Sequence, residues 1–391
     1  MLRLALALLC AGAALAQQPP VPSPARPAPY FSWDTVPRAF HGANRSGEFT
    51  PDALAALANY SLVTIEKWYT PCGGQGPSQA GPSCAVEDKM FAAFRALRAL
   101  RPEHTNIMYL NSMFDFAFYR LNGVVQAREA AGERLLLRDV HGQLVQLCND
   151  GNVYCNVTTF DWTSPAALAL WLEAMANATA DGAVDGVFAD HLASAIGEVT
   201  TPDGVPQLCN GKGALYRCYN FTPAFAAEFN AAHAWLGNRT QDLLARLPGR
   251  GPVVDGPYAS WAGNLPACNY SRLRLAVEAG LAGSAPFVLE ANHNSRACAP
   301  DDSCLANFLA AAEPYTYLTC FADAPVASTG SQLAFPLGPP TGPPRVRGGR
   351  VTRSFRGPLG LTNATVDLAS GAGSMAWAGQ APPPPPPLPP A

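Results

Sequence analysis

Two kinds of apolar pattern follow each other in turn along the middle of this chain, one typical of strands and one typical of helices. Short runs rich in β-branched and other apolar residues predict strands. These runs are Ala39–Asn44, Leu62–Lys67, Asn106–Ser112, Val184–His191, Pro252–Gly256, Phe287–His293 and Thr316–Phe321. Between most of them, apolar residues recur at spacings of three and four, which predicts amphipathic helices.

Three of the predicted helices begin at a hydroxyl residue followed by proline. The pairs are Thr50-Pro51, Ser164-Pro165 and Thr222-Pro223. The hydroxyl oxygen can accept a hydrogen bond from a free backbone N–H of the first turn, and proline loses no hydrogen bond at the first helical position. A fourth helix is predicted from Val86 to Leu100 and ends before Pro102.

Strands that alternate with helices predict a parallel sheet with helices on its faces. Seven or eight such units favour an α/β fold of the closed (β/α)8 TIM type over an open doubly wound sheet. No Gly-x-Gly-x-x-Gly motif follows the first strand, which disfavours a dinucleotide-binding fold. We predict one barrel domain over residues 30–380, with Ser374–Ala378 as its last strand and a long, weakly ordered loop at residues 338–360.

The two ends of the chain differ from this domain. Arg3, an apolar run and the small-residue site Ala14-Leu15-Ala16 predict a signal peptide over residues 1–16. The run is shorter than the roughly 20 residues that span a bilayer. Residues 17–29 and 381–391 are rich in proline and predict an extended spacer and tail. We therefore expect a secreted protein without a membrane span.

Cysteine usage agrees with secretion. Of the 11 cysteines, Cys10 lies in the predicted signal peptide, and the others form an even set that suggests disulfides in the loops. Short spacings suggest the pairs Cys72–Cys84, Cys148–Cys155, Cys209–Cys218 and Cys298–Cys304, which leaves Cys268 with Cys320. The sequence alone does not fix this pairing. No Cys-x-x-Cys pair occurs and the histidines are scattered, so we expect no metal and no other cofactor.

Motifs and charge narrow the classes of function. Asn-x-Ser/Thr motifs, which predict surface glycosylation, begin at Asn44, Asn59, Asn156, Asn177, Asn220, Asn238, Asn269 and Asn363. The net charge is −3 and no basic run stands out, so nucleic acid is not an expected partner. The Gly-x-Ser-x-Gly, His-Glu-x-x-His and P-loop motifs are absent from the sequence.

Polar residues at the ends of predicted strands are the candidates for chemistry, because the active site of such a barrel lies at the C-terminal ends of its strands. A buried carboxylate is costly unless it is paired or functional. Glycoside hydrolysis needs two carboxyl groups with different pKa values. We predict Asp190 and Glu290 as this pair, since each ends an apolar strand. The predicted carbohydrate-binding residues are Glu66, Asn111, Asp115, Asp161, Trp162, His191, Asp255, Asn292 and His293.

Alternatives remain open on the same residues. A catalytically silent glycan-binding or matrix protein would use the same barrel, and a transglycosylase would use the same two carboxyl groups with another acceptor. His191 and His293 could together bind a metal, but two histidines from distant segments are weak evidence for one.

Several of these segments together resemble an uncharacterised glycosyl-hydrolase-like family that is related loosely to α-galactosidase-like hydrolases. They are Phe31–Pro37, Leu62–Lys67, Tyr109–Arg120, Phe160–Trp162 and Val184–Asp190. The resemblance covers residues 30–325 and implies a TIM barrel that hydrolyses glycosidic bonds, without implying a substrate. Our own leading hypothesis is hydrolysis of an extracellular or cell-wall polysaccharide. It implies Asp190 as nucleophile at the end of the fourth strand and Glu290 as acid/base at the end of the sixth. The better-known members usually have aspartate at the second position, so Glu290 departs from their pattern.

Overall fold

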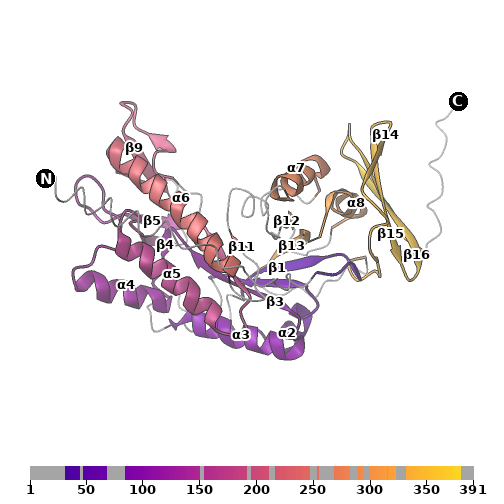
Figure 1. Cartoon of the computed structure of the whole chain (residues 1–391), viewed down its shortest axis with the longest axis horizontal. Coiled ribbons are helices and arrows are strands. Elements are labelled where there is room, and N and C mark those ends of the chain that lie inside the picture. The colour runs from indigo at the N-terminus through magenta and orange to yellow at the C-terminus, as the bar shows by residue number, and fades with distance from the viewer. Residues whose placement is uncertain are drawn as a thin grey trace.

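A parallel sheet of seven strands forms the centre of the protein (Figure 1). The computed structural model describes residues 31–44, 47–67, 84–149, 154–191, 195–210, 216–246, 253–254, 268–281, 289–293, 300–314, 316–322 and 332–379. The sheet order is β11-β7-β3-β2-β1-β13-β12, and every neighbouring pair is parallel. Its strands are β1 (Arg38–Gly42), β2 (Leu62–Ile65), β3 (Thr105–Asn111), β7 (Gly186–Asp190), β11 (Val253–Val254), β12 (Leu289–His293) and β13 (Thr316–Ala322).

All seven strands predicted from the apolar runs are present in the structure. The first strand, β1, lies between β2 and the late strand β13, so the sheet curls back on itself as in a barrel. Among the described residues, no hydrogen-bonded pairing joins the outer strands β11 and β12. The structure therefore confirms an α/β protein with a curled, parallel part of a barrel.

The helices are α2 (Pro51–Leu57), α3 (Val86–Leu100), α4 (Arg120–Ala130), α5 (Pro165–Ala180), α6 (Pro223–Arg246), α7 (Tyr270–Leu281) and α8 (Asp302–Ala311). The three predicted hydroxyl–proline helix starts are confirmed. The Thr50 hydroxyl accepts from the Ala53 N–H at 3.2 Å, Ser164 from Ala167 at 3.4 Å, and Thr222 from Phe225 at 3.2 Å. In the part of the chain that the structure describes, no helix has both the length and the apolar content to cross a membrane.

One face of the parallel sheet is covered by helices. On β3, the side-chain amide of Asn106 donates to the carbonyl oxygens of Phe94 in α3 and of Ala183, at 3.2 and 2.8 Å. Residues on alternate positions of the same strand point to the other face. Two small antiparallel sheets follow the strand ends: β4 (Phe114–Asp115), β6 (Tyr154–Thr159) and β5 (Gln146–Asn149), and β10 (Arg217–Asn220), β9 (Pro206–Asn210) and β8 (Val199–Thr200).

The C-terminal region departs from the prediction. It forms an antiparallel sheet of β14 (Arg345–Arg347), β15 (Arg350–Gly357), β16 (Gly360–Asp367) and β17 (Gly373–Ala376). The expected long loop at residues 338–360 is therefore wrong, and Ser374–Ala378 is not a barrel strand. Val351 and Phe355 are fully buried on alternate positions of β15. Arg353, a charged residue on a buried position between them, concealed this period of two in the sequence.

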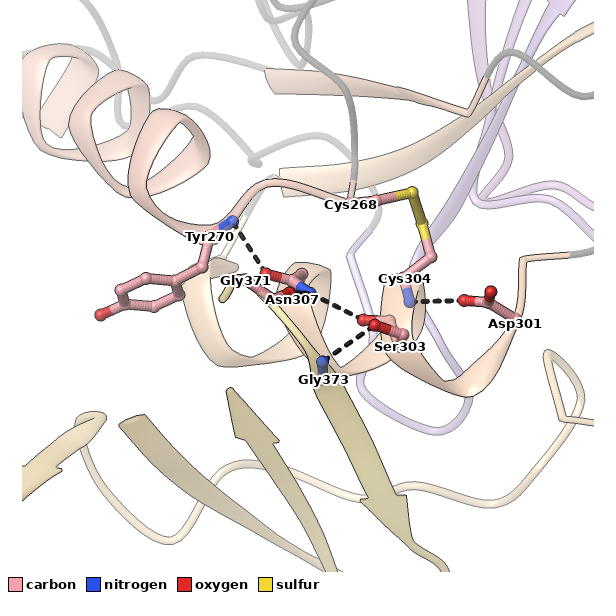
Figure 2. The surroundings of a disulfide bond; sticks show 8 residues. All are labelled: Cys268, Tyr270, Asp301, Ser303, Cys304, Asn307, Gly371 and Gly373. Atoms are coloured by element: carbon pink, nitrogen blue, oxygen red, sulfur yellow. Dashed lines mark hydrogen bonds between the residues drawn. A yellow bond between two sulfur atoms is a disulfide. The ribbon is translucent and has the colours of Figure 1, made fainter. Parts of the chain in front are cut away.

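Helix α8 packs against the C-terminal sheet and against α7 (Figure 2). The Gly373 N–H donates to the Ser303 hydroxyl at 2.8 Å, and the Asn307 amide donates to the Gly371 carbonyl at 3.1 Å. A Cβ atom at Gly373 would lie 2.5 Å from the Ser303 carbonyl oxygen, so only glycine permits this approach.

The disulfides correct part of the predicted pairing. Cys209–Cys218 joins β9 to β10, as the short spacing predicted. Cys304, however, pairs with Cys268, which precedes α7, and the two Cα atoms are 4.1 Å apart (Figure 2). The predicted pairs Cys298–Cys304 and Cys268–Cys320 are therefore wrong, because α7 and α8 pack side by side and bring distant cysteines together. Cys84 and Cys148 are also disulfide-bonded.

Candidate active site at the strand ends

The inner face of the curled parallel sheet, opposite the helices, carries a row of polar residues. Paired residues of a parallel ladder lie on the same face, and the register pairs His41 with Thr64, Tyr109 with Phe188, and Asn111 with Asp190. Since Thr64 in turn pairs with Ile107, these positions all share one face. Glu66, two residues after Thr64, follows the end of β2. The strand ends therefore gather these side chains at one edge of the sheet.

Asp190 ends β7 and is held by neutral donors from β3. The Tyr109 hydroxyl donates to its Oδ2 atom, and the Asn111 amide donates to the same oxygen at 2.8 Å. His191, in the left-handed backbone region at φ 64°, places Nε2 3.7 Å from Oδ2. The Asp190 side chain is 21% exposed, so its carboxylate can be reached from solvent.

A second group of charges lies beside this carboxylate. The Lys67 ammonium donates to Glu66 Oε2 at 3.0 Å and to the Tyr109 hydroxyl at 3.1 Å. His41 Nε2 lies 3.1 Å from Glu66 Oε1. Lys67 Nζ also lies 4.5 Å from the centre of the Tyr109 ring, in cation–π contact. Tyr109 therefore links Asp190 to the buried ion pair of Glu66 and Lys67.

The charges of this cluster fix its protonation. Burial opposes ionisation of Glu66, but the Lys67 ammonium and the His41 ring outweigh it and lower the pKa of Glu66 to about 2. Burial and the nearby Asp190 and Glu66 carboxylates raise the pKa of Tyr109 well above its ordinary value. At neutral pH Glu66 is therefore an anion, and Tyr109 keeps its proton as a hydrogen-bond donor.

Three predicted site residues lie outside this cluster. Asp115, in β4, accepts from the Asn122 amide at 2.6 Å and from the Thr158 hydroxyl at 3.2 Å. Burial raises the pKa of Asp115 to about 7.

Asp161 and Trp162 lie at the start of α5. Oδ1 of Asp161 accepts from the Thr163 N–H and hydroxyl at 3.1 and 2.6 Å. The Trp162 ring is fully buried and stacks between Phe160 and His233, with centroid distances of 5.2 and 5.9 Å. The contacts of both side chains are made within the protein.

The remaining predicted residues can be placed only by the main chain. Glu290 pairs with Tyr317 and Asn292 with Thr319, and Thr319 pairs with Ala39 of β1. Positions 290 and 292 therefore belong to the same alternating set as His41 and Asp190, whereas position 293 belongs to the other set. The side chains of these residues, and Asp255 as a whole, lie outside the described part of the structure.

Sequence reasoning missed His41, Lys67 and Tyr109. A signal for each was present: His41 lies at the end of the first strand, Lys67 directly follows Glu66, and Tyr109 precedes Asn111 by two residues on one face. Within the described ranges, no group of three histidine, cysteine, aspartate or glutamate residues could hold a metal ion. A hollow of about 360 Å³ lies on the opposite, helix-covered face and is lined by Met108, Leu110 and residues of α3, α4 and α5.

Comparison with known proteins gives structural neighbours only. No family model and no curated protein matches the chain. The solved structures that it resembles are glycoside hydrolases. The glycoside hydrolase domain of PelA from Pseudomonas aeruginosa shares 15% identity at a TM-score of 0.37, over 75% of this chain and 96% of that one.

Two further neighbours are longer enzymes. The GH36 α-galactosidase AgaA from Geobacillus stearothermophilus shares 12% identity at a TM-score of 0.48, over 85% of this chain and 47% of its own. The cycloalternan-degrading enzyme from Trueperella pyogenes shares 16% identity at a TM-score of 0.40, over 75% of this chain and 44% of that chain. This chain spans about half the length of both.

Proposed function

We propose that this protein is a secreted glycoside hydrolase that cleaves an extracellular or cell-wall polysaccharide. Asp190 acts as nucleophile or as the carboxylate that stabilises the positively charged transition state, and Glu290 acts as general acid/base. The observation that carries the proposal is the solvent-reachable Asp190 carboxylate at a strand end, which Tyr109 and Asn111 hold in place.

The neighbours of Asp190 suit such a role. Hydrogen bonds from Tyr109 and Asn111 favour the ionised form of a carboxylate and fix its direction. Neither donor carries a charge that would cancel the negative charge of Asp190. Tyr109 is in turn held by Lys67, so the carboxylate rests on a preorganised network and needs little rearrangement during the reaction.

The second carboxyl group must come from another strand. Glu66 is unsuited to donate a proton near neutral pH, because its pKa is about 2. Position 290 lies on the same alternating set of the sheet as Asp190, which supports Glu290 as the acid/base. We propose that Glu66, His191 and Asn292 contact sugar hydroxyls. The predicted binding residue Asn111 is buried and instead positions the Asp190 carboxylate. Asp115, Asp161 and Trp162 receive no role, because their contacts are made within the protein.

The test is cleavage of a panel of neutral and acidic polysaccharides, measured as new reducing ends. Asp190→Asn and Glu290→Gln should each lower the rate by about 10³-fold, as is typical when a positioned catalytic group is removed. Asp203→Asn, an exposed residue, is the matched control and should keep full activity. Full activity in both active-site variants would overturn the assignment. A glycan that binds without release of product would identify a silent glycan-binding protein instead.

Secretion is tested separately. When the full chain is expressed in a eukaryotic secretory host, the protein in the medium should begin near Gln17 and carry N-glycans that an amidase removes. Retention inside the cell with an intact N-terminus would contradict this part of the proposal.

A further inference from the structure

The outward face of the C-terminal sheet carries a row of arginines. Along β15, Val351, Arg353 and Phe355 are buried, so the residues between them point away from α8. The register pairs Arg347 with Arg350 and Arg345 with Thr352. Arg345, Arg347, Arg350 and Arg356 therefore share the outward face, on the sheet at the C-terminal end of the fold (Figure 1).

These four guanidinium groups are exposed and form no ion pair with a carboxylate of the described residues. No carboxylate of the described residues lies within ion-pair distance of any of them, whereas the buried Arg353 donates to Glu313 at 3.0 Å. Residues 332–379 contain five arginines and one acidic residue, Asp367, which lies opposite Arg350. The protein as a whole has a net charge of −3. Positive charge is therefore concentrated on this face, although the whole protein carries a net negative charge.

The other outward side chains of β15 and β16 are mostly small and polar, with Leu361 opposite Arg356 and Asp367 opposite Arg350. Thr352, Ser354, Asn363 and Thr365 lie on outward positions of β15 and β16. They offer hydroxyl and amide groups that hydrogen-bond to sugar hydroxyls. Aromatic side chains, on which the bases of single-stranded nucleic acids stack, are absent from the outward positions of the four strands.

We infer that this face binds a linear polysaccharide of uronic acids. A guanidinium group forms two parallel hydrogen bonds with a planar carboxylate, which a neutral sugar cannot match. From Arg350 to Arg356 the strand extends ~20 Å at about 3.4 Å per residue, so several sugar units of an extended polymer can lie along it. The inference goes beyond the proposed function and does not depend on it, because binding here needs no hydrolysis.

The first experiment uses the unsubstituted protein after enzymatic removal of N-glycans, since Asn363 begins an Asn-x-Thr motif on this face. Its affinity for polygalacturonate is measured by biolayer interferometry at 50 and 200 mM salt. The same polymer with fully methyl-esterified carboxyl groups is the matched ligand control. We expect binding to polygalacturonate that weakens with salt, and at least tenfold weaker binding to the ester.

The second experiment removes the charges from the protein. The triple variant R345Q/R347Q/R350Q should bind polygalacturonate at least tenfold more weakly, whereas R272Q, at an exposed position of α7, should bind as the unsubstituted protein does. Thermal unfolding checks that the variants are folded. Equal affinity of the triple variant, equal affinity for the ester, or tighter binding to dextran sulfate or to DNA than to polygalacturonate would each overturn the inference.

Discussion

The pKa values of two carboxyl groups in this protein are shifted in opposite directions. Glu66 follows β2 and Asp115 lies in β4, and burial disfavours the charged form of each. Glu66 contacts the Lys67 ammonium and the His41 ring, and its pKa falls to about 2. Asp115 receives only neutral donors, Asn122 and Thr158, and its pKa rises to about 7. The comparison teaches that neutral hydrogen bonds do not offset burial here, whereas a cation in contact does.

The largest change in stability is expected when the Lys67 cation beside Glu66 is removed. Lys67→Met leaves Glu66 buried beside an apolar side chain and should lower the free energy of unfolding by about 3–5 kcal/mol, the usual result of breaking a buried ion pair on one side. Guanidinium chloride unfolding at pH 7 measures the change. Lys89→Met, on the half-exposed surface of α3, is the matched control and should change stability by less than about 1 kcal/mol. Equal losses in both variants would show that Glu66 does not depend on Lys67.

The second test concerns Asp115. Its pKa is raised from 3.8 to about 7, so between these values the folded protein keeps a proton that the unfolded chain has lost. Stability should therefore fall as pH rises from 4 to 7, by up to about 4 kcal/mol from this group. Asp115→Asn keeps the shape without the charge. It should match the unsubstituted protein near pH 4 and exceed it in stability at pH 8. A loss of stability that is the same at both pH values would contradict the explanation.

The third test concerns acid unfolding. The pKa of Glu66 is lowered from 4.5 to about 2, so its contribution to stability is complete above pH 4.5 and is lost as pH falls toward 2. The loss should be about 3 kcal/mol. Unfolding free energies measured between pH 5 and pH 2 in an Asp115→Asn background isolate this effect. The further variant Glu66→Gln should lack this loss, and an identical acid dependence in both proteins would rule out Glu66 as its source.

The smallest effect is expected from a neutral donor. Thr158→Val removes the hydroxyl that donates to Asp115 at 3.2 Å and keeps the shape of the side chain. It should cost about 1 kcal/mol at pH 8, where Asp115 is charged, and less at pH 5, where it is protonated. Chemical unfolding at the two pH values measures the difference. A larger cost at pH 5 would mean that Thr158 acts through packing.

The sequence predicted the parts of this protein that depend on local patterns. Each strand of the parallel sheet coincides with a short run rich in apolar residues, and Thr50, Ser164 and Thr222 each begin a helix through contacts within three residues. Parallel strands also align their C-terminal ends, so Asn111 and Asp190 could be expected at one edge before the structure was known.

Features that depend on distant contacts were not predictable in this way. Cys304 is closer in sequence to Cys298, but the packing of α7 on α8 brings it to Cys268. The strands of residues 345–376 are amphipathic with buried positions that include Arg353, so their pattern resembles a polar loop. Asp115 shows the same limit at the site, because its chemistry depends on Asn122 and Thr158, which no strand-end pattern identifies.

Helix α8 has a consequence for how the protein can be divided. Every residue from Cys304 to Ala311 is buried, which is unusual for a surface helix and requires a partner on each side. Helix α7 packs against α8, and so do the strands from β15 to β17. A fragment that ends before residue 345 would expose Ala306 and Asn307 to water, because these residues lie against Gly373 and Gly371. Expression boundaries for this protein should therefore keep both sheets in one polypeptide.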